Sequence, residues 1–209
     1  RGERIDSLTY GLQAPQATLA KSRAGRWRLA LPTPLGENEF LFTGTPQALH
    51  ISEFLSRPLS NDPVGEFVEL VNDSPLPIPL EEVCLSDAPE IDPRKQGFPA
   101  LSFIGPNAFL TLAENPESIQ GARALSFGLS SQPSALALSR SSGQSIDVYA
   151  YGPQRTGWSE GRGRNFERAS FPVPNPGQPN PSLTEQPHPV QLSEIIASNQ
   201  SVPAAANQR

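Results

Sequence analysis

Arginine and aromatic side chains gather towards the end of the chain, in a pattern that could bind a ligand. Guanidinium groups bind anions and stack on aromatic rings, and aromatic rings stack on bases. Glu160 and Glu167 interrupt the run, and a similar group stands at 23–28. We expect most of these side chains to be structural, with Trp27 and Phe166 packed in the core. The candidate surface for a protein, glycan or anion is Arg155, Trp158, Arg162, Arg164 and Arg168.

Acidic residues form a second group with potential chemistry. Paired carboxylates can exchange protons, and several carboxylate oxygens together can hold Ca²⁺. No Asp-Xaa-Asp-Xaa-Asp calcium loop occurs in the sequence. We therefore expect solvated side chains, with a weak Ca²⁺ site as the alternative and catalysis as the remotest reading. The residues concerned are Glu53, Asp62, Glu66 and Glu69, followed by Asp87, Glu90 and Asp92.

The sequence has few cysteine and histidine residues for nucleophilic chemistry. The single cysteine, Cys84, lies in a short apolar segment, and the two histidines are His50 and His188. A Cys–His pair would have to form in space, and a buried inert thiol is the usual state of a free cysteine. The Gly161–Arg164 segment lacks the Lys-Ser/Thr of a phosphate loop. We assign no catalytic residue and no cofactor, and we expect a non-enzymatic protein.

Composition limits the fold and the partners. The chain has 209 residues, of which 24 are proline and 16 are glycine, so long helices are not expected. No apolar run reaches the length of a transmembrane helix, which predicts no membrane insertion. The net charge of −5 argues against a nucleic-acid partner. The acidic excess lies in residues 48–130, whereas the segments 1–46 and 131–180 are each slightly basic.

The two basic segments share a repeated sequence. Residues 5–13 (IDSLTYGLQ) correspond to residues 146–154 (IDVYAYGPQ), 141 positions later. At the same offset, residues 50–55 (HISEFL) correspond to residues 191–196 (QLSEII). Two matches in the same order at one offset indicate a repeat, and a period near 140 is the length of a domain.

The repeat predicts a domain organisation. We expect residues 1–38 to be the C-terminal strands of a preceding unit, 39–47 a linker and 48–180 a complete unit. We expect 181–209 to be a Pro-rich linker with the first strand of a following unit. The chain would then be a section of a longer protein with tandem domains. Lacking its early strands, 1–38 should either pack on the central unit or fray.

Short apolar segments separated by turn sequences favour an all-β fold. Alternation at 49–54 predicts a strand with Leu49, Ile51 and Glu53 on one face. Residues 66–71 have apolar side chains on both faces, as in a central strand with both faces covered. Leu70 and Phe109 are expected in the core. Further strands are expected at 83–85, 101–103, 109–112, 135–138 and 146–151.

The order of these motifs resembles the lamin tail domain family, which implies an immunoglobulin-like β-sandwich. The chain is most similar to bacterial members, which occur in tandem in secreted or surface proteins. Cys84 departs from the family, which usually has an aromatic residue there, and a smaller core side chain would result. The matching segments are 51–54, 61–72, 79–80, 84–87, 92–95, 98–99, 104–106, 127–130, 143, 146–147, 151–154 and 161–162.

The resemblance implies a non-catalytic module of a bacterial extracellular or cell-surface protein. Its expected role is structural spacing, adhesion, or protein or glycan binding, with neighbouring domains of the same chain as further partners. The alternative is an accessory module of a secreted nuclease, phosphatase or spore-coat-kinase-like enzyme. Because fold similarity alone does not fix function, the sites have to decide between these roles.

Overall fold

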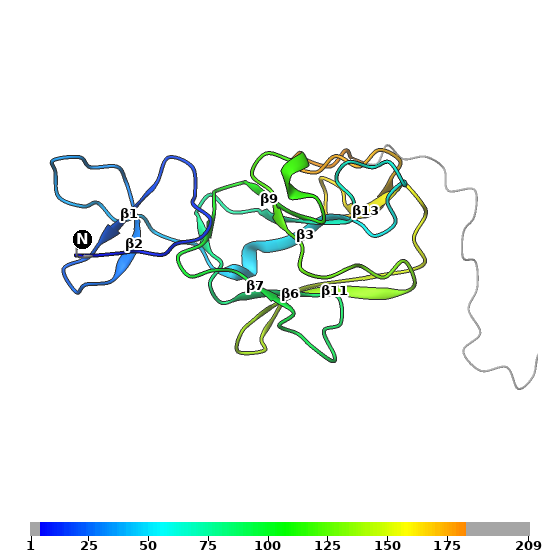
Figure 1. Cartoon of the computed structure of the whole chain (residues 1–209), viewed down its shortest axis with the longest axis horizontal. Helices are drawn as coiled ribbons and strands as arrows, with labels where there is room; N and C mark the ends of the chain where they lie inside the picture. Colours follow the sequence, from blue (N-terminus) through cyan, green and yellow to red (C-terminus); the bar gives the residue numbers. More distant parts are fainter. Residues whose placement is uncertain (1–4, 183–209) are drawn as a thin grey trace, which may run out of the picture.

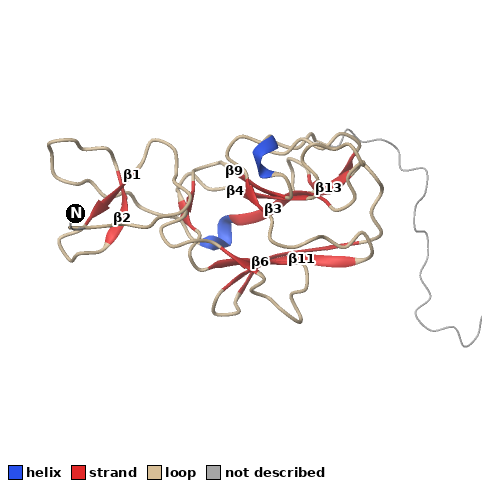
Figure 2. Cartoon of the chain, in the orientation of Figure 1, coloured by secondary structure: helices blue, strands red, loops and turns tan. Residues whose placement is uncertain are grey.

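The protein is all-β, as predicted, and its two main sheets face each other as layers (Figures 1 and 2). The computed structural model describes residues 5–182. The larger sheet has the strand order β10-β9-β4-β3-β13-β14. Its strands are β3 (Leu49–Leu55), β4 (Phe67–Asn72), β9 (Phe109–Ala113), β10 (Arg123–Ala124), β13 (Ser159–Arg162) and β14 (Arg168–Phe171).

The smaller layer and the connecting elements are short. The smaller sheet has the order β12-β11-β6-β7, from β6 (Val83–Ser86), β7 (Gln96–Gly97), β11 (Ser134–Arg140) and β12 (Ser145–Tyr151). Two-stranded pairs are β1 (Thr18–Lys21) with β2 (Trp27–Ala30), and β5 (Ile78–Pro79) with β8 (Phe103–Ile104). The only helices in residues 5–182 are the 3₁₀ turns η1 (Pro46–Ala48) and η2 (Pro116–Ser118).

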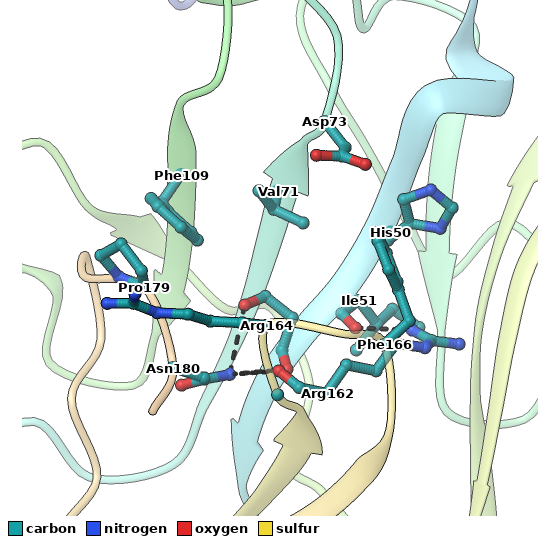
Figure 3. A pocket seen from close by; sticks show the side chains of 12 residues that line it. His50, Ile51, Val71, Asp73, Phe109, Arg162, Arg164, Phe166, Pro179 and Asn180 are labelled. Carbon is teal, nitrogen blue, oxygen red and sulfur yellow. Dashed lines mark hydrogen bonds between the residues drawn. The ribbon is translucent and has the colours of Figure 1, made fainter. Parts of the chain in front are cut away.

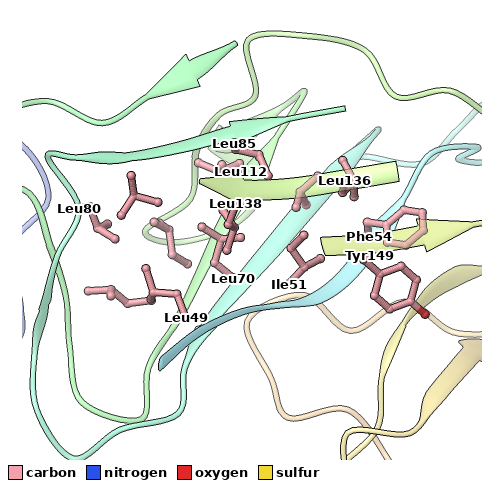
Figure 4. Close-up of a cluster of buried hydrophobic side chains, with 14 of the residues drawn as sticks. Leu49, Ile51, Phe54, Leu70, Leu80, Leu85, Leu112, Leu136, Leu138 and Tyr149 are labelled. Carbon is pink, nitrogen blue, oxygen red and sulfur yellow. The ribbon is translucent and has the colours of Figure 1, made fainter. Parts of the chain in front are cut away.

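The main core fills the space between the two large sheets (Figure 4). Leucines and isoleucines dominate it, and Phe54 packs against Tyr149 and Tyr151 with ring centroids 5.5 and 4.7 Å away. Leu70 is buried as expected, whereas Phe109 is half-buried and faces outwards. The buried members include Leu49, Ile51, Phe54, Val68, Leu70, Leu80, Leu85, Leu112, Leu136, Leu138, Tyr149 and Tyr151.

A bulge in β3 corrects the predicted faces of that strand. The pairing with β4 skips Ser52, between Ile51↔Leu70 and Glu53↔Glu69. An inserted residue resets the alternation, so side chains beyond it change face. Phe54 therefore joins Leu49 and Ile51 in the core, and Glu53 points to the outer face, opposite to the prediction. Simple alternation cannot reveal such a bulge.

Residues 5–44, here called the N-terminal lobe, extend from one end of the sandwich and pack against it (Figure 1). The Gly11 amide donates to the Ala100 carbonyl at 3.1 Å, and Phe103 donates to Leu12 at 2.8 Å. A small second core joins Ala14 and Leu29 of the lobe to Phe103. The segment therefore packs on the central unit, which is the first of the two predicted alternatives.

The β1–β2 hairpin of the lobe matches the β13–β14 hairpin of the sandwich in register. Thr18 pairs with Ala30 and Lys21 with Trp27, while 141 positions later Ser159 pairs with Phe171 and Arg162 with Arg168. The turns match too. The Ser22 amide donates to the Arg26 carbonyl, as Gly163 does to Glu167, each at 2.8 Å. The sequence offset thus extends to strand pairing.

The predicted linker 39–47 is not a free tether at its start. Ala30 and Phe40 form an isolated β-bridge, and the Leu41 amide donates to the Leu29 carbonyl at 3.0 Å. The start of the expected linker 39–47 is therefore paired with β2. The strand expected in 190–209 lies outside the described residues.

Candidate functional site

The outer face of the larger sheet carries the candidate site. After β14, residues 172–182, here called the strap, return across this face. The Asn180 side-chain amide donates to the carbonyls of Ser52 at 3.1 Å and Arg162 at 3.0 Å. Because Asn180 is buried, these bonds fix the strap to β3 and β13 at the bulge of β3.

Two carboxylates lie buried beneath the strap. Glu53 and Glu69 are directly opposite each other on β3 and β4, and both are 0% exposed. Glu53 Oε1 accepts hydrogen bonds from the Ser159 hydroxyl and, at 3.3 Å, the Asn175 amide. Glu69 Oε2 accepts from the Gly177 amide and, at 3.4 Å, the Thr111 hydroxyl. The prediction that these two acids are solvated is wrong, because the strap covers them.

Burial controls the protonation of this pair. It raises the pKa of Glu53 and raises that of Glu69 to about 8, where the neighbouring Glu53 charge adds to the effect. Oxygens Oε2 of Glu53 and Oε1 of Glu69 have no hydrogen-bond partner among the described residues. A protonated carboxyl is the species that such an environment stabilises. Within residues 5–182 no group of three or more His, Cys, Asp or Glu could hold a metal ion.

A hollow of about 190 Å³ lies beside the strap on the same face (Figure 3). We call it the aromatic hollow. Phe109 stands on one side and Phe166, beside His50, on the other, with Val71 between them. The His50 and Phe166 rings meet edge to face with centroids 5.1 Å apart. The polar or charged residues along it are Ser52, Asp73, Arg162, Arg164 and Asn180.

Phe166 has an unusual backbone and position. Its φ is +62°, in the left-handed region that glycine favours, and its side chain is 47% exposed. The corresponding turn position of the lobe is Gly25, with φ of +77°. The prediction that Phe166 packs in the sandwich is wrong, because this backbone directs the ring onto the outer face. A bulky residue in this conformation is strained, and such strain concentrates at functional sites.

The predicted arginine surface is divided among separate environments. Arg162 is paired with Asp147, its two terminal nitrogens lying 2.8 and 2.9 Å from the carboxylate oxygens. Arg168 lies over the Tyr149 ring at 4.4 Å. Arg155 stacks on Trp158 at 4.0 Å, and neither residue lines the hollow. Arg162 and Arg164 both line it, but only Arg164 lacks an ion pair or hydrogen bond within residues 5–182.

The cysteine and the described histidine lie on different sheets. Cys84 is buried on β6, and burial raises the pKa of its thiol. His50 lies on β3 of the larger sheet and lines the hollow on its outer face, whereas Cys84 belongs to the smaller sheet. Asp73, Phe109 and Asn180 were missed as site residues, since nothing in their local sequence indicates a shared outer face.

Comparison with known proteins supplies no relative. No protein-family model matches the chain, and neither the curated proteins nor the solved structures contain a match. Among residues 5–182 no helix has the length and apolar character to span a membrane.

Proposed function

We propose that the chain is a section of a bacterial extracellular or cell-surface protein built from tandem lamin-tail-like, immunoglobulin-like units. In this proposal the module is non-catalytic. It separates neighbouring domains, supports adhesion and binds a protein or glycan. The lamin tail resemblance remains a prediction from motif order.

The repeated hairpin is the observation that carries this proposal. β1–β2 and β13–β14 share strand register and turn hydrogen bonds at an offset of 141 residues. Coincidence of register over both strands is the outcome expected for two copies of one domain end. A domain-length period implies successive units along one chain, which is the arrangement of a spacer.

Exposure of repeated residues supports the same proposal. Tyr151 is 5% exposed in the sandwich, whereas its counterpart Tyr10 is 57% exposed. Ile5 is almost fully exposed, and its counterpart Ile146 is half-buried. A sequence patterned for burial but left exposed lacks the strands that would cover it.

Hydrogen exchange on the full chain tests the arrangement. We expect the β1–β2 amides to exchange through local opening, at lower free energy than the β13–β14 amides, because β1 pairs only with β2 within residues 5–182 and β2 adds only the bridge to Phe40. Exchange of both hairpins only on global unfolding would show that the lobe is an integral part of one domain. The proposal of tandem units would then fail.

Ligand-induced shifts in melting temperature test the binding role. The full chain is screened against oligosaccharides, matrix proteins, double-stranded DNA and CaCl₂. Saturable stabilisation by a glycan or protein is the expected result. Stabilisation by DNA that decreases steeply with salt would replace the proposal with nucleic-acid binding. Turnover of a glycosidic or phosphodiester substrate would overturn the non-catalytic assignment.

A further inference from the structure

The aromatic hollow has the shape of a slot for one small ring. Its opposite sides are the rings of Phe109 and of Phe166 with His50, and Val71 lies between them (Figure 3). A volume of about 190 Å³ is below that of pockets for drug-sized ligands, so it suits a single ring or side chain. The apolar sides would contact both faces of a flat, partly apolar group.

Charged groups of opposite sign stand at two edges of this slot. Figure 3 shows Asp73 above Val71 and Arg164 extending along the lower side towards Pro179. Neither Asp73 nor Arg164 forms an ion pair or hydrogen bond through its side chain within residues 5–182. Asp73 can only accept hydrogen bonds when ionised, and Arg164 can only donate them.

This combination favours a sugar over other rings. A pyranose has C–H groups on its faces, which pack on aromatic rings, and hydroxyls around its edge, which both donate and accept. It therefore satisfies an acceptor and a donor at once. An aromatic peptide side chain would fill the slot but offer at most one hydroxyl, and a phosphate would be repelled by Asp73.

The strain at Phe166 indicates that its ring has a role beyond folding. The lobe makes the same turn with Gly25, so the turn does not need a phenyl ring. The ring gains an edge contact with His50 yet remains about half exposed. An exposed aromatic side chain held in a strained conformation next to a hollow supports a role as a contact residue.

We propose that the aromatic hollow binds one uncharged pyranose ring of a glycan. Phe109 and Phe166 stack on the sugar, Asp73 accepts hydrogen bonds from its hydroxyls, and Arg164 donates to them. This inference rests on the binding role proposed above and assigns that role a place and a ligand class.

The test uses the full ¹⁵N-labelled chain and three probes: methyl β-glucoside, methyl β-galactoside and N-acetylglucosamine. Each is titrated to about 10 mM, tenfold above a millimolar Kd. N-acetyltyrosinamide and inorganic phosphate serve as probes for the competing ligand classes. We expect saturable amide shifts at residues 71–73, 109 and 164–166 with at least one sugar.

Two variants and two matched controls locate the contact. Phe166→Gly should weaken sugar binding roughly tenfold or more, because it removes one stacking face while keeping a turn that Gly25 already makes. Arg164→Gln should weaken it roughly two- to tenfold, as for one lost hydrogen bond. Phe42→Gly removes a phenyl ring that is 83% exposed in the lobe, and Arg155→Gln removes a charge outside the hollow. Neither control should change the affinity.

The possible outcomes separate this inference from the module function. Stronger binding of N-acetyltyrosinamide or phosphate than of every sugar would overturn the ligand class. No sugar-induced shift at these residues, or unchanged affinity in Phe166→Gly, would overturn the site. If a glycan or protein then stabilises the chain through other residues, the binding role proposed for the module still stands.

Discussion

The two matched hairpins differ in what surrounds them. β13 is paired on both sides, with β14 and β3, and the strap crosses its outer face. In the described part of the chain, β1 is paired with β2 alone. The substitution of Ala20 by Gly161 at the same position follows from this, because a Cβ at Gly161 would collide with the Ser52 carbonyl of β3. Neighbouring strands, rather than the hairpin itself, decide which side chains are tolerated.

Substitution of the repeated tyrosines should give the largest difference in stability loss between the sandwich and the N-terminal lobe. Tyr151→Ala is expected to lower the free energy of unfolding by about 3–5 kcal/mol, since Tyr151 is buried against Phe54 and donates to the Ser130 carbonyl. Tyr10→Ala should change it by less than about 0.5 kcal/mol, because Tyr10 is mostly exposed. Urea denaturation measures both. Similar losses in the two variants would contradict the difference in burial between the N-terminal lobe and the sandwich.

Substitution of the repeated aspartates should give the next largest difference in stability loss. Asp147→Asn should cost about 1.5–3 kcal/mol, because the half-buried Arg162 loses a charged partner and one of the two accepting oxygens becomes an amide donor. Within residues 5–182, its counterpart Asp6 accepts a hydrogen bond only from the adjacent Ser7 amide, and Asp6 is exposed. Asp6→Asn should therefore change stability by less than about 0.5 kcal/mol. A cost near zero at Asp147 would show that the ion pair is compensated elsewhere.

The turn glycine and Phe166 can be exchanged between the hairpins. Gly25→Phe should destabilise the lobe by about 1–2 kcal/mol, the cost of a left-handed backbone with a side chain, measured by exchange of the β1–β2 amides. Phe166→Gly should change the unfolding free energy of the sandwich by less than about 1 kcal/mol, since relief of strain offsets the lost His50 contact. A large loss would make Phe166 a structural residue.

The buried acid pair belongs to the sandwich alone and makes its stability depend on pH. The pKa of Glu69 is raised from 4.5 to about 8, so the folded state holds more protons than the unfolded state between these values. The contribution of Glu69 to stability is therefore greatest below about pH 4.5 and declines as pH rises to 8. Glu69→Gln should reduce the decline in melting temperature across that range.

A matched control separates the pair from general charge effects. Glu90→Gln also removes one acid, at an exposed position of the smaller-sheet loop. Its pH profile should follow that of the unmodified chain. If Glu69→Gln and Glu90→Gln leave the same slope, the pH dependence arises elsewhere in the protein.

Local patterns predicted the strands but not the outer face of the larger sheet. The apolar segments around Leu70 and Leu136 lie where expected, because alternation and turn residues are local properties. The bulge at Ser52 and the strap over Glu69 depend on contacts with residues more than 100 positions away. Burial of the acids and exposure of Phe166 were therefore beyond single-sequence reasoning, although comparing Phe166 with Gly25 at the repeat offset would have drawn attention to that turn.

The attachment of the strap has a mechanical consequence. Tension applied beyond residue 182 reaches the sheet through Asn180, whose amide holds carbonyls of both β3 and β13. Force is thus divided between two adjacent central strands instead of peeling β14 from the edge. Ser52 is the residue that the β3–β4 pairing skips, so this load reaches β3 at its bulge. Rupture of a module under tension should begin at this amide, with the strap, before either sheet yields.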